Sequence, residues 1–409
     1  MSVALTSCQE RALQLLDSGR NVFLSGEAGT GKSFLLKHWV DSLEVPYAVT
    51  ASTGVAALLA GGRTVHSFFG VGKGDEDLHH LLRVRNGTRK QERLRDIQVL
   101  IIDEISMLGA SLFTKLEAIA KHDRKSTEPW GGLQVVVVGD MNQLPPVNDS
   151  FCINSPAWKT SKFKPVLMRT QVRSEDVEFS RLLKKIRYAE LDQDVVNFLN
   201  ERSAVQIDDS WVRVLPRRNE VDIWNRKKLY ALGKPTSLIN AASYGNDQLV
   251  LSLLSAMPVP KDLLISVDAY VMFRVNDPAS RFANGTTGYI REIHRDYLAI
   301  DLAVDGQPSG EVVKVTRHKF QFKEQDEVLA EVRQFPIQLA WAVTTHKTQG
   351  ATLQRAAISL LGLWESGQAY TAISRVRRPE HVAILGWEPH SFITDPTVTE
   401  LYKLLERIG

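Results

Sequence analysis

Two groups of residues have the types and spacing needed for phosphate chemistry: a glycine-rich run that ends in Lys-Ser, and an Asp-Glu pair further along the chain. Glycines let backbone N–H groups close around phosphates, a lysine places positive charge at the β- and γ-phosphates, and a following hydroxyl can ligate Mg²⁺. The run therefore predicts a site for ATP and Mg²⁺. Its residues are Gly26, Glu27, Ala28, Gly29, Thr30, Gly31, Lys32 and Ser33.

The acidic pair, Asp103 and Glu104, directly follows the apolar run 99–102. In a parallel sheet the carboxyl ends of the strands face the ligand, so both side chains should emerge beside the glycine-rich loop. We expect Asp103 to ligate Mg²⁺ and Glu104 to act as the base that orients the attacking water. The alternative is an acidic helix N-cap. Gln143, in the turn after the apolar run 135–138, is expected to sense the γ-phosphate.

Short β-branched runs with helical stretches between them must position these residues. They lie at 21–24, 47–50, 99–102, 135–138 and 165–168. Near-continuous apolar strands that alternate with helices indicate a parallel sheet covered on both faces. About the first 170 residues therefore read as one α/β domain.

A second α/β unit is indicated by strand-like runs at 211–215, 356–360 and 381–385, with a helix at 220–232. Between its halves, residues 268–335 carry short alternating runs separated by turns at Asn284-Gly285 and Asp305-Gly306, which are typical of antiparallel strands. This segment is expected to form a small inserted β-barrel.

Composition describes an ordinary globular protein. The 409 residues are 44% hydrophobic and 24% charged, and the formal net charge is only +3. The sequence has no apolar run long enough to cross a membrane and no secretory signal at its start. Two cysteines, Cys8 and Cys152, are too few for a disulfide framework and suit a reducing compartment. Basic residues cluster at 83–95 and 159–187; each cluster is either a phosphate-backbone track or a solvated face.

Several further stretches contain residue types that a simple ATPase does not need. Residues 51–57 are small, and 62–69 place arginine and histidine beside two aromatic rings, a combination that suits base stacking and phosphate contact. Residues 344–350 mix hydroxyls, histidine, lysine and glycine, which suits contact with both DNA phosphate and nucleotide. Arg375 and Arg173 are candidates for arginine fingers from a second domain. For Phe68 and Phe69, packing in the core is an equally good alternative.

These motifs, in this order over residues 9–377, resemble the PIF-type (petite-integration-frequency) helicases, superfamily-one 5′-to-3′ DNA helicases. The resemblance rests on Gly-Glu-Ala-Gly-Thr-Gly-Lys-Ser, Gly-Arg-Thr-Val-His-Ser-Phe, Gly-Asp-Met-Asn-Gln-Leu-Pro-Pro-Val, Thr-Thr-His-Lys-Thr-Gln-Gly and Tyr-Thr-Ala-Ile-Ser-Arg. The segment 115–134 is similar to the one that distinguishes the PIF type from its relatives, with Trp130 where phenylalanine is more usual. Ser174 after Arg173 replaces the usual glutamine.

The resemblance implies a fold: two RecA-like parallel-sheet P-loop domains with two insertions. The first domain would span 1–165, with a small wedge insertion at about 63–80. The second would comprise 166–267 and 336–409, interrupted by an SH3-like β-barrel at 268–335. ATP would lie in the cleft between the two domains, closing it when bound.

The resemblance also implies a role for individual residues. Gln9 would read adenine, and Gly350 would lie next to the nucleotide. Lys32, Ser33, Asp103, Glu104 and Gln143 would bind and hydrolyse Mg²⁺-ATP, and Arg173 and Arg375 would contact the γ-phosphate. Residues in DNA-binding motifs are Thr53, Gly54, His66, Phe68, Pro145, Asn284, Thr345, His346 and Lys347.

The implied activity is 5′-to-3′ translocation on single-stranded DNA with unwinding of duplexes, forks or G-quadruplexes. The rivals are a DNA-dependent translocase without strand separation, an RNA helicase, and a regulatory ATPase or nuclease-complex subunit of the RecD type. We expect a monomer with no membrane partner. The lack of a long N-terminal extension indicates the compact bacterial or phage form in the cytoplasm; a eukaryotic fragment would be nuclear or mitochondrial.

Overall fold

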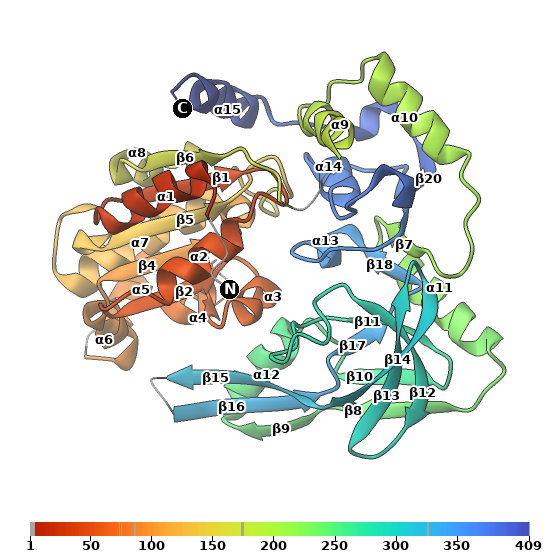
Figure 1. Cartoon of the computed structure of the whole chain (residues 1–409). Helices are drawn as coiled ribbons and strands as arrows, with labels where there is room; N and C mark the ends of the chain where they lie inside the picture. Colours follow the sequence, from red (N-terminus) through yellow and green to blue (C-terminus); the bar gives the residue numbers. More distant parts are fainter. Residues whose placement is uncertain are drawn as a thin grey trace. The chain divides into compact units, whose positions relative to one another are not determined.

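The computed structural model describes residues 5–408 apart from 73, 75, 86, 173–175 and 325–326. The chain forms two compact units (Figure 1). The first comprises Met1–Glu175 and Thr394–Gly409, and the second comprises Asp176–Ile393. The chain therefore passes from one unit to the other twice.

The first unit is built on a six-stranded parallel sheet with the order β3-β2-β4-β5-β1-β6. Because β4, β5 and β1 are neighbours, the turns that follow their carboxyl ends share one edge of the sheet. The strands are β1 (Val22–Gly26), β2 (Tyr47–Ala51), β3 (Arg63–Thr64), β4 (Val99–Asp103), β5 (Gln134–Gly139) and β6 (Lys164–Met168).

Helices α1 and α2 cover the central strands of this sheet and bury apolar side chains against them, among them Leu16, Leu35 and Trp39. The helices of the first unit are α1 (Ser7–Asp17), α2 (Lys32–Val40), α3 (Gly54–Leu59), α4 (Val65–Phe69), α5 (Leu78–Arg85), α6 (Arg89–Asp96), α7 (Ala110–Arg124), α8 (Pro156–Ser161) and α15 (Pro396–Ile408), with 3₁₀ turns at Ile105–Met107, Pro129–Gly132 and Cys152–Asn154.

The second unit has its own four-stranded parallel sheet, with the order β18-β7-β19-β20. The strands are β7 (Val212–Leu215), β18 (Ala342–Thr344), β19 (Ala356–Leu360) and β20 (Val382–Trp387). The associated helices are α9 (Val177–Arg187), α10 (Gln193–Ser203), α11 (Arg218–Ala231), α13 (Thr345–Thr348) and α14 (Gln368–Ile373), with 3₁₀ turns at Pro379–His381 and Pro389–Ser391.

Antiparallel strands are inserted between β7 and β18 of this parallel sheet. Five of them form a sheet with the order β14-β13-β12-β11-β17, at the place of the expected barrel. Two smaller sheets, β15-β16-β9 and β10-β8, accompany it. The elements are β8 (Thr236–Asn240), β9 (Ala242–Gly245), α12 (Asp247–Ala256), β10 (Asp262–Ser266), β11 (Tyr270–Phe273), β12 (Thr287–Ile293), β13 (Tyr297–Val304), β14 (Gln307–Thr316), β15 (His318–Glu324), β16 (Glu327–Gln334) and β17 (Ile337–Leu339).

The expectation of two RecA-like α/β domains with an all-β insertion is confirmed by these sheets, but the boundaries differ. Strand β6 pairs in parallel with β1, so the first domain runs past residue 165. The C-terminal segment from Thr394 belongs to the first unit and not to the second. Inserted antiparallel pairing begins at β8, well before residue 268, and ends with β17 after residue 335.

Candidate nucleotide-binding site and nucleic-acid-contacting motifs

The glycine-rich loop connects β1 to α2 and depends on glycine for its shape. Gly29 and Gly31 have φ of +87° and +82°, which side chains rarely adopt. A Cβ on Gly31 would lie 2.8 Å from Nε2 of Gln9 and 3.3 Å from a methyl of Val172. The loop therefore keeps its backbone accessible because the glycines carry no side chain, which is the property that a phosphate cradle needs.

Lys32 lies at the first turn of α2 and reaches back over the loop. Its Nζ donates to the carbonyl oxygens of Gly26, at 2.7 Å, and Glu27, at 2.8 Å. The Thr30 hydroxyl donates to the same Glu27 carbonyl at 3.0 Å. Ser33, one residue beyond Lys32, is exposed. The Lys32 ammonium is thus held over the loop backbone, where phosphate oxygens would be bound, and Ser33 follows it directly in the chain.

Gln9 lies next to this loop although it precedes it by more than a helix. It is buried and occupies the third position of α1, where its Oε1 accepts from the Thr6 backbone N–H at 2.9 Å and the Thr6 side chain caps the helix in return. The capping contacts fix the amide so that its nitrogen faces Gly31. Its reading of adenine stays a prediction.

Asp103 is the last residue of β4, and Glu104 follows in the left-handed region at φ +51°. Oδ1 of Asp103 accepts from the Glu104 backbone N–H at 2.8 Å, and the Ser52 hydroxyl donates to the Glu104 carbonyl at 2.7 Å. Desolvation by the surrounding protein and, secondly, the Glu104 charge raise the pKa of Asp103 to about 7, against the opposing influence of Lys32. The alternative role of this pair, an acidic helix N-cap, does not explain why the Asp103 and Glu104 carboxylates lie so close together.

Mg²⁺ fits this donor set. Magnesium prefers carboxylate and hydroxyl oxygens together with phosphate oxygens, and Asp103 with Ser33 supplies such ligands. A bound cation would also offset the unfavourable charge that the raised pKa of Asp103 reveals. Among the described residues no group of three or more His, Cys, Asp or Glu side chains could hold a metal ion by itself, so the phosphates would have to complete the coordination.

Gln143 ends a tight turn that follows β5. Its backbone N–H donates to the Asp140 carbonyl at 2.9 Å, and its side chain is largely buried. β5 lies between β4 and β1 in the sheet, so this turn is carried by the same sheet edge as the glycine-rich loop and Asp103. Its contact with a γ-phosphate stays a prediction.

Sequence reasoning missed a segment that lies against the loop. Gln171 donates through Nε2 to the Ala28 carbonyl at 2.8 Å, and the Val172 N–H donates to the Gly29 carbonyl at 2.9 Å. The candidate γ-phosphate residue Arg173 comes next in the chain but lies outside the described residues. The motif had been singled out for Arg173 alone, and its neighbours carried no signal of this contact.

Arg375, the second candidate arginine, lies just after α14 in the second unit and is 2% exposed. Its Nε donates to the Thr371 carbonyl at 2.8 Å and its Nη2 contacts the Ser374 hydroxyl at 3.0 Å. These local contacts hold the guanidinium against its own helix. Its contact with a phosphate is therefore a prediction that requires some of these bonds to be exchanged.

The first-unit residues expected to contact DNA differ in their surroundings. Thr53 caps α3, with its hydroxyl accepting from the Ala56 N–H at 3.2 Å, and Gly54 begins that helix. Burial lowers the pKa of His66. Phe68 is 5% exposed and packs edge-on against Phe69, with ring centroids 5.4 Å apart. The core-packing alternative accounts for the Phe68 ring, and stacking on a base requires the ring to leave this contact. Pro145, after the Gln143 turn, is partly exposed.

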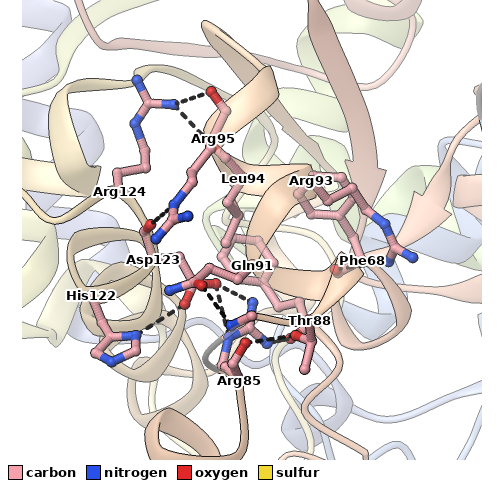
Figure 2. Close-up of polar contacts among 12 residues, drawn as sticks. Phe68, Arg85, Thr88, Gln91, Arg93, Leu94, Arg95, His122, Asp123 and Arg124 are labelled. Atoms are coloured by element: carbon pink, nitrogen blue, oxygen red, sulfur yellow. Dashed lines mark hydrogen bonds and ion pairs between the residues drawn. The ribbon is translucent and has the colours of Figure 1, made fainter.

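Most of the described arginines of the basic cluster 83–95 serve the structure of the first unit. Figure 2 shows Arg85 paired with Asp123 and Arg95 donating to the Asp123 carbonyl. The side chains of the pair are 1% and 0% exposed, and the Arg95 bond is 2.7 Å long. Arg85 also donates to the Phe69 carbonyl, and Arg93 reaches the Phe68 carbonyl at 3.4 Å. The cluster therefore ties α5, α6 and α7 to α4. These three arginines are committed to internal contacts and do not form an open phosphate track.

In the second unit, Thr345, His346 and Lys347 make up most of α13, a helix of four residues that follows β18. Thr345 is buried, and His346 Nε2 lies 3.1 Å from a Glu365 oxygen. Withdrawal of water by the surrounding polypeptide and the charges of Arg274 and Arg218 lower the pKa of Lys347, although its side chain reaches solvent. A lysine crowded by other cations is well placed to gain from an arriving anion.

Two other predicted residues lie on turns of the same unit. Asn284 is 8% exposed, and neither polar atom of its side chain has a hydrogen-bond partner. Gly350 has φ +74° after α13. Buried Arg274 directly follows β11 and donates to the Lys347 carbonyl at 2.7 Å, so it connects the end of that strand to α13. Arg274 carried no motif signal and was not predicted. The described residues contain no helix long and apolar enough to span a membrane.

A glycine-rich phosphate loop, an acidic pair and a polar turn, all at one edge of a parallel sheet, define a P-loop nucleoside triphosphatase with a RecA-like fold. A sequence model of the family described as PIF1-like helicase matches residues 4–197. The ATP-dependent DNA helicase Pif1 of Bdellovibrio bacteriovorus is 38% identical over 415 residues, covering 99% of this chain and 93% of that protein. This chain belongs to the PIF1-like helicase family.

Solved structures agree with this assignment. Bacteroides sp Pif1 in complex with ADP-AlF4 superposes with a TM-score of 0.87 at 26% identity, covering 100% of this chain and 98% of that one. Bacteroides Pif1 bound to ssDNA superposes with a TM-score of 0.71 at 26% identity and the same coverage.

Proposed function

We propose that this chain is an ATP-dependent DNA helicase that moves 5′-to-3′ along single-stranded DNA and unwinds duplexes. The observation that carries the proposal is the geometry of the first unit: Lys32 over a glycine cradle, with Asp103 and Glu104 two strands away in the sheet order β4-β5-β1. The Bdellovibrio relative, which shares nearly the whole length, is named an ATP-dependent DNA helicase.

In the proposed reaction, Lys32 and the loop N–H groups hold the β- and γ-phosphates, while Ser33 and Asp103 hold Mg²⁺. The metal, when bound, neutralises charge that develops on the phosphates. Glu104 accepts a hydrogen bond from the attacking water and aligns it. Gln143 responds to the γ-phosphate, and Arg173 and Arg375 stabilise its charge during transfer. Gln9 and Gly350 contribute to binding of the nucleotide.

DNA binding in this proposal involves Thr53, Gly54, His66, Phe68 and Pro145 of the first unit. The second unit contributes Asn284, Thr345, His346 and Lys347. Support comes from the burial and the neighbouring cations that lower the pKa of Lys347 and from the unpartnered amide of Asn284, since both groups would gain from phosphate or base contacts. The ssDNA-bound Bacteroides structure and another described as DNA unwinding at forked dsDNA support single-stranded and forked DNA as partners. We further propose that G-quadruplexes are among the DNA partners, that the protein is a monomer and that it is located in the cytoplasm.

The deciding experiment measures strand displacement on duplexes that carry either a 5′ or a 3′ single-stranded tail. The proposal expects ATP-dependent unwinding of the 5′-tailed duplex, and loss of both hydrolysis and unwinding in Lys32→Ala. Arg375→Ala should retain ATP binding but lose turnover; unchanged turnover would remove Arg375 from the mechanism.

The same assays separate the rivals. DNA-stimulated hydrolysis without strand displacement would indicate a translocase, and stronger stimulation by RNA than by DNA would indicate an RNA helicase. Hydrolysis that no nucleic acid stimulates would favour a regulatory ATPase. Steep loss of DNA affinity with rising salt is expected, because binding to phosphates releases counterions.

A further inference from the structure

The C-terminal helix α15 places a tyrosine hydroxyl among the motifs of the first unit. Tyr402 is 0% exposed, and its Oη lies 2.7 Å from the Ser25 hydroxyl, 2.9 Å from the Met141 backbone nitrogen and 3.1 Å from Oδ1 of Asp140. Ser25 directly precedes the glycine-rich loop. Asp140 and Met141 begin the turn that ends at Gln143. A residue near the end of the chain thus makes hydrogen bonds to the start of each of two nucleotide-site motifs.

The polarity of these contacts can be assigned from the chemistry of a phenol. The hydroxyl has one proton, which it donates to the Asp140 carboxylate, and two lone pairs, which accept from the Met141 N–H and the Ser25 O–H. Ser25 is 0% exposed and Asp140 is 1% exposed, so water does not replace these bonds. Buried polar groups of this kind are costly to leave unsatisfied, and together they specify one arrangement of the two strand ends.

The remaining contacts of α15 suggest that the helix presents the tyrosine as a fixed part of the site. Helix α15 packs on β6, the strand next to β1, and Arg169 after β6 donates to the Glu406 carbonyl at 3.3 Å. The hydroxyl contacts the end of β1, just before the glycine-rich loop, and the start of the Gln143 turn after β5. Its effect on hydrolysis would therefore act through the alignment of β1 and β5.

We propose that Tyr402 is a positioning residue for ATP hydrolysis, whose hydroxyl sets the Gln143 turn relative to the glycine-rich loop. The inference deepens the proposed function and rests on its ATPase reaction. Tyr402→Phe keeps the ring and its packing but removes the three hydrogen bonds. Lys32 and the loop remain, so nucleotide should still bind. The alignment of the turn with the γ-phosphate, on which turnover depends, should be lost.

The test compares DNA-stimulated ATP hydrolysis by the full chain, by Tyr402→Phe and by Tyr270→Phe. Tyr270 is a matched control in the second unit. It is 1% exposed, and its hydroxyl donates to the Ser210 carbonyl at 3.0 Å, a buried hydrogen bond that Tyr270→Phe removes. Thermal unfolding of both variants is measured in parallel. We expect kcat of Tyr402→Phe to fall about tenfold while KM for ATP changes less than about twofold, with Tyr270→Phe close to the unaltered chain.

A second pair of variants tests whether the hydroxyl acts through its partners. Ser25→Ala should also lower kcat. In the double variant with Tyr402→Phe, the fold loss in kcat should be smaller than the product of the losses in the two single variants. Unchanged kcat in Tyr402→Phe overturns the inference, and so does a rise in KM with kcat preserved. If the unaltered chain hydrolyses no ATP, the proposed function fails instead, so the two failures can be told apart.

Discussion

The buried ion pair between Arg85 and Asp123 offers a sharp test of how the first unit is held together. The Asp123 carboxylate accepts from Nε of Arg85 at 2.8 Å and also from Nη2, and it contacts Nδ1 of His122 at 3.0 Å. Because the two side chains are 1% and 0% exposed, Asp123→Ala leaves a guanidinium in the interior without its carboxylate. Stranding one partner of a buried pair costs about 3–5 kcal/mol.

That cost is large beside the roughly 5–15 kcal/mol that stabilises a typical domain. Replacing both partners by apolar residues avoids it, because no charge is then buried alone. The double variant Arg85→Met with Asp123→Leu should therefore recover most of the stability that Asp123→Ala loses. Glu178→Ala provides a matched control, since its pair with Arg181 has side chains 73% and 53% exposed and should contribute less than about 1 kcal/mol.

The assay is urea unfolding followed by tryptophan fluorescence, since Trp130 is buried in the first unit. The two units can unfold in separate transitions, so the relevant one is identified by its shift when nucleotide is added. A loss below about 1 kcal/mol for Asp123→Ala would refute the reasoning. So would a double variant no more stable than the single one.

Three further experiments test other parts of the first unit. Gly31→Ala forces a side chain at φ +82° into the nucleotide loop and should weaken binding of a fluorescent ATP analogue roughly tenfold, whereas Gly19→Ala, at φ +71° with open space around it, should leave binding unchanged. Burial would raise the pKa of Cys8, but hydrogen bonds from threonine hydroxyls and backbone N–H groups outweigh it and lower the pKa to about 7. The Cys8 thiolate therefore forms as pH rises through about 7, and iodoacetamide labelling followed by mass spectrometry should show that midpoint. Buried Cys152, whose pKa is raised, should stay unmodified. A labelling midpoint near 9 for Cys8 would contradict the prediction. Trp130→Phe removes a 2.7 Å hydrogen bond to a hydroxyl of α8 and should cost about 1 kcal/mol in urea unfolding without changing ATP hydrolysis; a change in hydrolysis would show a further role.

Local patterns explain why much of the fold was predictable. The strands of the first sheet at 21–24, 99–102 and 135–138 are short, largely apolar runs, and such runs have few alternatives. The glycine-rich loop and Asp103 were predictable for a related reason. Their chemistry requires particular residue types at fixed distances from a strand end, so the motif carries its own structural context.

The parts that were missed depend on contacts between distant residues. Strand β9 pairs with β16 across more than eighty residues, and nothing local in either run names the partner. Helix α15 has a clear amphipathic pattern, but that pattern shows only that one face is buried and not which sheet it covers. Proximity in the sequence to β20 suggested the second domain, whereas the helix belongs to the first unit.

The same distinction separates the two kinds of functional residue in this chain. In the proposed reaction Lys32 and Asp103 contact phosphate and metal directly, so their identity is constrained by chemistry and visible in the sequence. Tyr402 and Arg85 make buried contacts inside the first unit, and many side chains could supply a hydrogen bond or an ion pair to a strand end or a helix. Such residues become recognisable only when burial and partners are known: a tyrosine in the C-terminal helix becomes informative because its hydroxyl lies within 3.1 Å of three groups at the starts of two motifs. Buried polar side chains that bond to residues at the start of a motif are therefore the places to search for positioning residues in this unit, and the Tyr402→Phe measurement tests that rule as well as the residue.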